Sequence, residues 1–431
     1  MSTTASASIV PNDAAAHYMS ARRVGEWFLA AIVFLGAFVI IEPAPYELAL
    51  VFLTIGWVIV GLRVDRYLLP LLLLLVLYVV GGLIGLTMVE SFGDPIVYLG
   101  TTALLAASAI LFAAIIAVDP GRRFQVIINA YVIGAVAASI VGILGFFVGS
   151  EFFTLYGRAR GTFQDPNVFG PFLVLPFSYL IYSIFTAQAR RPLLNAAAAF
   201  VILIALFLTF SRAAWGMTAF VVPLVAFIAF VNHRNGTERA RLIIYATVGT
   251  VLGAMAIAVV LSLPGTSDLF AERAQLVQTY DGGAYGRFER QSQGFLLIFD
   301  KPLGVGPFQF AEIFGGDEHN MWLKGFTVYG WIGGFAYIAL VVWTLIISVP
   351  LLFKRRPWHP IIICAFSAYL GHLIVHNVID NDHWRHLFLI YGVLWGGYVA
   401  ERRCEKPTRP AEGVVPEAQT FRAAIPRAFA S

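Results

Sequence analysis

Clusters of arginine and lysine alternate along this chain with connections that carry almost none, and long apolar runs separate the two kinds. A helix needs about 20 apolar residues to cross a hydrocarbon layer, and these runs reach that length. Of the 431 residues, 59% are hydrophobic and 13% charged, which is too apolar for one soluble core with a charged surface. In lipid only helices or closed barrels satisfy their backbone hydrogen bonds internally. The pattern therefore predicts an all-α polytopic membrane protein.

The hydropathy pattern predicts twelve transmembrane helices. The apolar runs fall near 25–42, 46–62, 67–86, 96–117, 124–148, 167–186, 193–209, 213–231, 241–263, 326–349, 358–376 and 384–399. The first run is too long for the apolar region of a cleavable signal peptide, so we expect it to act as a signal anchor.

The charge alternation assigns a side of the membrane to each connection. The clusters are Arg22/Arg23, Arg63/Arg66, Arg122/Arg123, Arg190/Arg191, Arg234/Arg239/Arg241, Lys354/Arg355/Arg356 and Arg402/Arg403/Lys406. The positive-inside rule makes these connections, and both termini, cytoplasmic. We expect disordered cytoplasmic tails at 1–24 and 404–431, transmembrane helices 1–9 over 25–263, a large helical outer loop over 264–325, and helices 10–12 over 326–403.

Composition also excludes several classes of function. The two cysteines, Cys364 and Cys404, provide neither a disulfide framework nor a thiolate metal site. The pI near 9.0 follows from arginines in cytoplasmic loops, and no nucleic-acid-binding motif is present.

Nine cations fall on the predicted outer side, against the topological preference. They are Arg158, Arg160, Arg212, Arg273, Arg287, Arg290, Lys301, Lys324 and Arg385. Each cation alone could be a snorkelling anchor. For Arg273, Lys301 and Lys324, snorkelling is as good an explanation as ligand binding. The planar fork of arginine suits phosphate oxygens, so several converging arginines would form a diphosphate site.

Three polar motifs hold five of these cations. In RARGTFQDPNVFGPF, Asp165-Pro166 predicts a helix N-cap, and the helix terminus would attract an anion beside Arg158 and Arg160. Capping alone also explains Asp165, and Asn167 is equally ambiguous. In TFSRAAWG, Arg212 occupies a short turn between two apolar helices. In YGRFERQ, Arg287 and Arg290 share one helix face.

The most specific motif is His319-Asn320, followed by nine residues and Gly330-Trp331-Ile332-Gly333. This spacing resembles the signature of the O-antigen ligase family, which includes polysaccharide polymerases and protein O-oligosaccharyltransferases. GTFQDPNVFG, Ser211-Arg212, PLGVGPF and the large loop before the last three helices resemble that family in the same order. The resemblance covers about residues 150–400.

A last polar motif, IDNDHWRH, lies at the final outer turn. Asp380, Asp382, His383 and Arg385 of this motif could join the site. His372 and His376 could also form a metal site with His383 and His386, but polar packing or acceptor binding explains them better.

The resemblance implies a GT-C-like, metal-independent inverting glycosyltransferase of the bacterial inner membrane, active on the periplasmic side and without a cofactor. Its donor would be a saccharide on undecaprenyl diphosphate, and its acceptor a glycan, either lipid A core or a growing polysaccharide. His319, Arg212 and Arg287 would be catalytic. The substrate-binding residues would be Arg158, Arg160, Asp165, Asn167, Arg290, Asn320, Asp382, His383 and Arg385. These motifs do not distinguish a ligase from a polymerase. The alternative functions are a transporter of polysaccharide or lipid-linked oligosaccharide, and a protein O-oligosaccharyltransferase.

Overall fold

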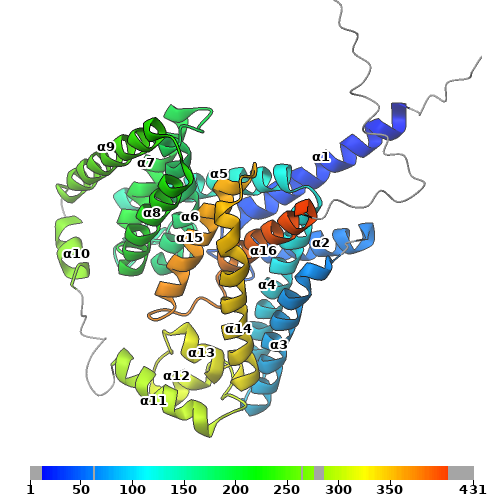
Figure 1. Cartoon of the computed structure of the whole chain (residues 1–431). Coiled ribbons are helices and arrows are strands. Elements are labelled where there is room, and N and C mark those ends of the chain that lie inside the picture. The colour runs from blue at the N-terminus through cyan, green and yellow to red at the C-terminus, as the bar shows by residue number, and fades with distance from the viewer. Residues whose placement is uncertain (1–11, 62–63, 264–265, 276–285, 406–431) are drawn as a thin grey trace, which may run out of the picture.

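The computed structural model describes residues 12–61, 64–263, 266–275 and 286–405 and has a helix at each of the twelve predicted apolar runs (Figure 1). The helices are α1 (Asn12–Leu35), α2 (Pro45–Val60), α3 (Leu69–Gly85), α4 (Gly93–Val118), α5 (Pro120–Val148), α6 (Pro166–Phe185), α7 (Pro192–Leu208), α8 (Arg212–Asn232), α9 (Gly236–Leu261), α14 (Gly330–Ser348), α15 (His359–Val375) and α16 (Arg385–Glu405). Short 3₁₀ turns flank α3 and follow α14: η1 (Arg66–Leu68), η2 (Leu86–Met88) and η3 (Val349–Phe353).

The structure confirms an all-α polytopic membrane protein. Among the described residues, seven helices are long and apolar enough to cross a membrane: α3 with its flanking turns, α4, α5, α6, α8, α9 and α14. Helices α2, α7 and α15 are apolar but shorter. Helix α9 shows how the chain depends on lipid, because only 6% of its most apolar stretch is buried inside the protein. Twelve crossings remain a prediction of the hydropathy pattern.

Local sequence explains where these helices begin. Proline occupies the first turn of α2, α5, α6, α7 and α15, where no backbone N–H needs an acceptor. Asp165, Ser211 and Asn320 cap α6, α8 and α13 with side-chain oxygens. At the first helix the prediction was wrong: α1 begins at Asn12, so residues 12–24 are helical rather than disordered. Residues 1–11, and the tail after Glu405, lie outside the described residues.

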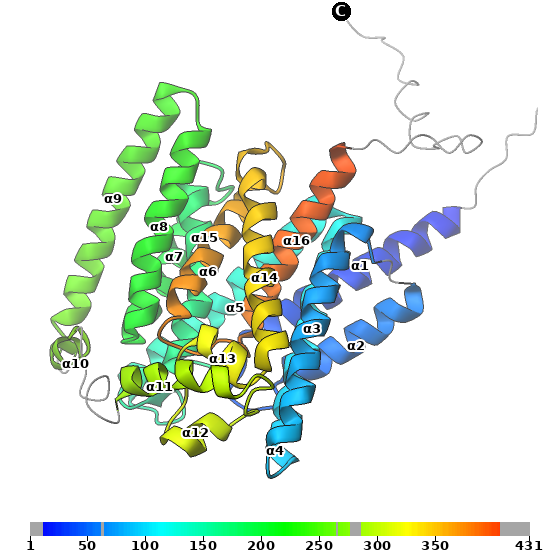
Figure 2. The ribbon, with the colours of Figure 1, turned by 60° about the horizontal axis from the view of Figure 1, so that its bottom comes forward.

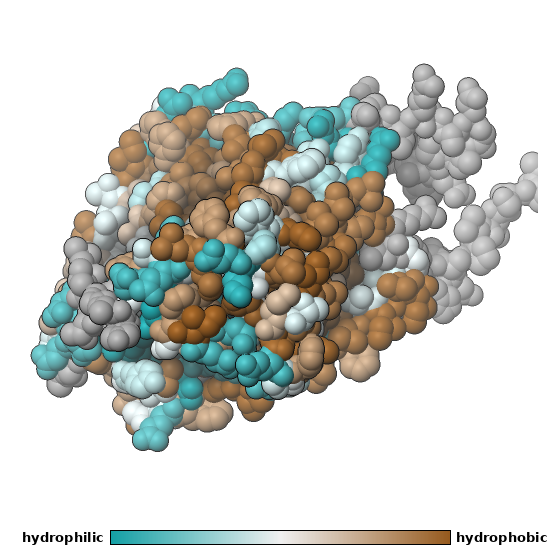
Figure 3. All heavy atoms as spheres, turned by 90° about the horizontal axis from the view of Figure 1, so that it is seen from below, coloured by the Kyte–Doolittle hydropathy of each residue, from teal (hydrophilic) through white to brown (hydrophobic). Residues whose placement is uncertain are grey.

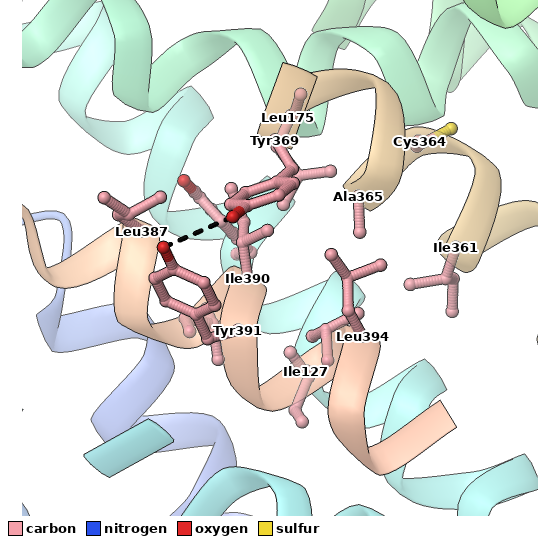
Figure 4. Packing of buried hydrophobic residues seen from close by; sticks show 14 of the residues in the cluster. Ile127, Leu175, Ile361, Cys364, Ala365, Tyr369, Leu387, Ile390, Tyr391 and Leu394 are labelled. Carbon is pink, nitrogen blue, oxygen red and sulfur yellow. Dashed lines mark hydrogen bonds between the residues drawn. The ribbon is translucent and has the colours of Figure 1, made fainter. Parts of the chain in front are cut away.

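The helices pack around an apolar centre in which α16 lies against α4 and α15 (Figure 2). Figure 4 shows α15 and α16 meeting through leucine, isoleucine and tyrosine side chains, and the Tyr369 hydroxyl donates to that of Tyr391 at 3.4 Å. A hydroxyl pair of this kind satisfies polar groups that would otherwise be orphaned in the core. The contact therefore fixes the relative position of the two helices.

Helices α3 and α14 approach each other through glycines. A Cβ at Gly81 would overlap the carbonyl oxygen of Tyr329 and lie 2.6 Å from the backbone nitrogen of Gly333. Small residues permit such close backbone contact in membranes. Gly333 of α14 therefore packs closely against α3.

We expect Gly81→Ala to destabilise the protein by about 3 kcal/mol, because the overlapped atoms are backbone and cannot move aside. Alanine gains about 1 kcal/mol in helix propensity, which is too little to compensate. Gly100→Ala in α4 is the matched control, since no atom lies within 4 Å of its added Cβ. Unfolding midpoints in detergent would measure both. Equal stability of Gly81→Ala and wild type would contradict the packing.

Residues of the arginine clusters form ion pairs with carboxylates at one end of the bundle. They join Arg22 to Asp119, Arg122 to Glu26, Arg403 to Asp65 and Arg356 to Glu401. These residues come from connections that the charge alternation assigns to one side. The structure thus brings the clusters together, while the side of the membrane they face remains a prediction.

The alternate connections meet at the opposite end. The backbone N–H of Val39 donates to Thr162 O at 2.8 Å, and that of Met321 donates to His376 O at 2.8 Å. Four short helices cover this end: α10 (Thr266–Arg273), α11 (Arg287–Asp300), α12 (Gln309–Phe314) and α13 (Met321–Thr327). In Figures 1 and 2, α11, α12 and α13 lie together beyond the ends of α14 and α15. The predicted loop over 264–325 thus contains four short helices among its described residues. Residues 264–265 and 276–285 lie outside the described part.

Candidate functional site

The His319-Asn320 pair lies where the chain enters α13. The side chain of Asn320 is buried and caps that helix, with its Oδ1 accepting from Leu323 N at 3.1 Å. His319 has a φ of 45°, a left-handed conformation that few non-glycine residues adopt. Such conformations persist only where the surroundings impose them and they cluster at functional sites.

Two neighbours impose the conformation. Asp380, from the turn before α16, accepts from Asn320 N at 2.9 Å and from His319 N at 3.3 Å. On the other side, the Gln291 amide of α11 donates to Glu318 O and His319 O, each at 3.0 Å. The backbone of His319 is thus held by the side chain of Asp380, 61 residues later, and by that of Gln291, 28 residues earlier. The imidazole itself is half-buried.

Helix α11 also directs two arginines to this segment. Arg287 donates to the carbonyl oxygen of Val378 at 3.3 Å. The guanidinium carbon of Arg290 lies 2.9 Å from the position of a Cβ at Gly316, so the guanidinium packs against this glycine. Arg287 and Arg290, three residues apart on α11, thus contact two neighbouring loop segments.

Asp380 also belongs to a network of charged side chains with Lys324 and Asp382. Lys324 Nζ lies 3.5 Å from Asp380 Oδ2 and 3.7 Å from Asp382 Oδ1. Asp382 is buried and accepts hydrogen bonds from the Tyr98 and Tyr329 hydroxyls, the latter at 3.0 Å. His383 contacts Thr102 Oγ1 through Nε2 at 2.8 Å.

These contacts decide the charge of each group. Burial alone would lower the pKa of Lys324, but Asp380 and Asp382 outweigh it and raise the pKa well above its ordinary value. Burial would raise the pKa of Asp382, but Lys324 and His383 hold it below its ordinary value. Burial lowers the pKa of His383. The network therefore places the Lys324 ammonium between the carboxyl groups of Asp380 and Asp382.

Glu318 precedes the histidine and is almost fully buried. Its Oε1 accepts from Thr327 Oγ1 at 2.8 Å. Burial raises the pKa of its carboxyl to about 7 against the lowering influence of Lys324.

This pKa predicts a pH-dependent stability. The folded state favours the protonated form of a carboxyl whose pKa is higher when folded than when unfolded. The contribution of Glu318 to the free energy of unfolding therefore falls as the pH rises from about 4.5 to 7, and it is constant above that range. We expect wild type to lose on the order of 3 kcal/mol over this range relative to Glu318→Gln, which keeps an acceptor for Thr327. Unfolding midpoints of both proteins between pH 4.5 and 8 would test this. Parallel curves would refute it.

A second group of predicted residues gathers around the start of α6 and α8. Arg158 is buried, donates from Nε to Thr209 O at 2.8 Å and donates from Nη2 to Asn167 Oδ1 at 2.8 Å. It is held by a small hairpin, β1 (Thr154–Leu155) and β2 (Arg158–Ala159), whose turn residues Tyr156 and Gly157 both have positive φ.

The remaining members of this group support the backbone. Asp165 caps α6 through Asn167 N at 2.6 Å, as the capping interpretation predicted. Arg160 donates to the carbonyl oxygens of Glu151, Phe152 and Gln164. Arg212 opens α8 and donates to Gln275 O at 3.0 Å, and Phe210, two residues earlier, is in a left-handed conformation. The amino-terminal end of α8 and α11 lie at the same end of the bundle in both ribbon views (Figures 1 and 2).

Arg385 lies apart from both groups. Its guanidinium is buried and pairs with Glu47, and with Glu42 at 3.2 Å. These partners come from the segment around the start of α2. The two carboxylates give Arg385 a structural role in joining α16 to that segment.

Several site residues are absent from the sequence prediction. They are Glu318, Gln291, Tyr98, Thr102 and Tyr329. Glu318 adjoins the His-Asn motif, and that adjacency could have identified it. The others come from apolar helices or from α11 and carry no local signal.

Polar side chains gather on the face of the molecule that carries α11, α12 and α13, between apolar flanks (Figure 3). Residues 197–338 match the family model described as O-Antigen ligase. That stretch runs from α7 to α14 and contains Arg212, Arg287, Arg290 and the His319-Asn320 pair. No curated protein matches the chain significantly.

Proposed function

We propose that this chain takes part in surface-polysaccharide biosynthesis as a metal-independent inverting glycosyltransferase, since residues 197–338 match the O-Antigen ligase family model. It would transfer a saccharide from undecaprenyl diphosphate to a hydroxyl of an acceptor glycan on the periplasmic face of the bacterial inner membrane. The acceptor is lipid A core or a growing polysaccharide. The donor's isoprenoid tail would lie between helices, in the membrane.

One observation carries the proposal. His319 is held in a left-handed conformation by Asp380 and Gln291, while Arg287 and Arg290 are directed to the same loop layer. An imidazole and two guanidinium groups in one site could handle a proton and a departing phosphate together. This combination supports group transfer from a diphosphate better than transport.

The arginines would stabilise the leaving group. As the acceptor oxygen bonds to the anomeric carbon, the bond from that carbon to the phosphate oxygen breaks and its electron pair leaves with undecaprenyl diphosphate. Negative charge therefore grows on the diphosphate, and guanidinium groups already in position stabilise it. Arg287 and Arg290 would do this from α11, and Arg212 from the start of α8. Arg158, Arg160, Asp165 and Asn167 would shape the adjoining part of the donor site.

His319 would act at the acceptor. Its ring nitrogen would accept the proton that the acceptor hydroxyl loses on attack, or would donate a hydrogen bond to the diphosphate. Asn320 would keep the pair in place by capping α13, and Asp382 and His383 would contact the acceptor from the charged network. Arg385 would act indirectly, by fixing α16, because Glu42 and Glu47 already pair with it.

The polysaccharides of a strain that lacks this chain would test the function. Single repeat units held on undecaprenyl diphosphate would identify a polymerase, and long polymer held there would identify a ligase. A normal lipid-linked and surface profile would refute the proposal. Lipid-linked saccharide that accumulates on the cytoplasmic side would identify a transporter, and loss of glycan from proteins alone would identify a protein O-oligosaccharyltransferase.

A further inference from the structure

A hollow of ≈610 Å³ lies between α5, α6 and α7, at the end of the bundle that carries the arginine clusters. Its polar lining comprises Gln125, Asn129, Ser183, Asn195, Arg190 and Arg191. Apolar side chains such as Ile133 and Leu194 line the rest, and both are exposed. The hollow is therefore amphipathic and open to the surroundings of the bundle.

The amides in this hollow face outward from a membrane helix. Gln125 and Asn129 are exposed and lie one turn apart on α5, where Gln125 Nε2 donates to Asn129 Oδ1 at 2.8 Å. Asn129 is about 13 Å from the start of α5 at 1.5 Å per residue. Exposed amides are costly against hydrocarbon, so a polar group should cover them at this depth. A lipid headgroup reaches that depth.

The charge of the hollow indicates which kind of lipid headgroup would bind there. Arg190 and Arg191 are exposed, and neither has a carboxylate partner among the residues that the structure describes. Arg356 and Arg403, at the same end, are both paired with carboxylates. Two unneutralised guanidinium groups favour a phosphate, and the neighbouring amides and hydroxyl provide further hydrogen bonds.

We propose that this hollow is a binding site for an anionic glycerophospholipid. The phosphodiester would bind Arg190 and Arg191, the amides of Asn129 and Asn195 would contact the glycerol region, and the acyl chains would follow the apolar walls past Ile133. Basic pockets between membrane helices on the cytoplasmic side suit such headgroups. The site lies at the opposite end from His319, so it is separate from the glycosyl-transfer chemistry.

The test is native mass spectrometry of the full-length protein in detergent with equal amounts of phosphatidylglycerol and phosphatidylcholine. Wild type should retain phosphatidylglycerol in preference. The double variant Arg190→Gln/Arg191→Gln should bind phosphatidylglycerol about 20- to 30-fold more weakly, since each surface charge contributes about fivefold. Its weak binding of phosphatidylcholine should not change.

Two further variants separate the site from general attraction to basic surface. Arg355→Gln removes an exposed arginine at the same end and should leave retention unchanged. Asn129→Leu should weaken retention without altering charge. Equal retention of both lipids by wild type, or an equal loss in Arg355→Gln, would overturn the proposal. Displacement of the lipid by millimolar inorganic phosphate would also overturn it, because the site would then recognise a free anion.

Discussion

Replacing His319 by alanine should abolish polysaccharide product, a loss of roughly 100- to 10,000-fold if the imidazole moves the acceptor proton. The backbone of His319 is bonded to Asp380 of the charged network and to Gln291 of α11, the helix that also carries Arg287 and Arg290. The protein should still insert and fold, because the bonds that hold this segment come from Asp380 and Gln291 to backbone atoms. Transfer in membranes from a strain complemented with the variant would measure the effect.

A second substitution separates chemistry from backbone strain. Alanine tolerates the left-handed conformation of residue 319 poorly, whereas asparagine adopts it readily. We therefore expect His319→Asn to fold like wild type and remain inactive. Asp317→Ala is the matched control, since Asp317 is exposed and lies two residues away. Wild-type product from both His319 variants would remove the histidine from the site.

Replacing Arg212 by alanine should lower transfer by roughly 100- to 1,000-fold, the usual cost of removing one preorganised group that stabilises developing charge. Arg212 stands at the first turn of α8, two residues after the left-handed Phe210, and its guanidinium donates to Gln275 O. The effect should fall on the rate at saturating donor as well as on donor affinity, because the diphosphate gains charge as it leaves.

The conservative variant sharpens this prediction. Arg212→Lys keeps the charge but loses the planar fork, so we expect partial recovery only. Lys301→Ala, which removes an exposed cation of the same predicted outer side, should leave transfer unchanged. If Arg212→Ala and Lys301→Ala reduce transfer equally, the arginine contributes only general charge. Unchanged transfer in Arg212→Ala would exclude it from the site.

Sequence reasoning could predict most of the fold, for reasons that are local. Hydropathy over about 20 residues fixes a helix, and capping residues such as Asp165 and Ser211 mark where it begins. The mistake at residues 12–24 has the same origin, because a stretch without an apolar run carries no signal for the first turns of α1. The resemblance to the O-antigen ligase family could also be recognised from the sequence, because the residues of its motif lie close together at a fixed spacing.

Predicting the candidate site succeeded only in part. The helix that carries Arg287 and Arg290 contacts the His319-Asn320 segment through Gln291, while the roles of these residues stay predictions. Arg385 instead pairs with Glu42 and Glu47, which precede it by more than three hundred residues. Nothing near Arg385 in sequence reveals those partners. A cation in a polar motif can equally bind a ligand or an internal carboxylate, and only the fold distinguishes these outcomes.

The sequence by itself thus determined an all-α membrane protein, the starts of most of its helices and the motif that identifies its family. Tertiary structure alone decided that Asp380 and Gln291 hold His319 in a left-handed conformation, that Lys324 lies between two carboxylates, and that the hollow beside Asn129 exists. The physical reason is the range of the interactions. Hydropathy and capping act within a few residues, whereas hydrogen bonds and ion pairs of the site join segments that only packing brings together.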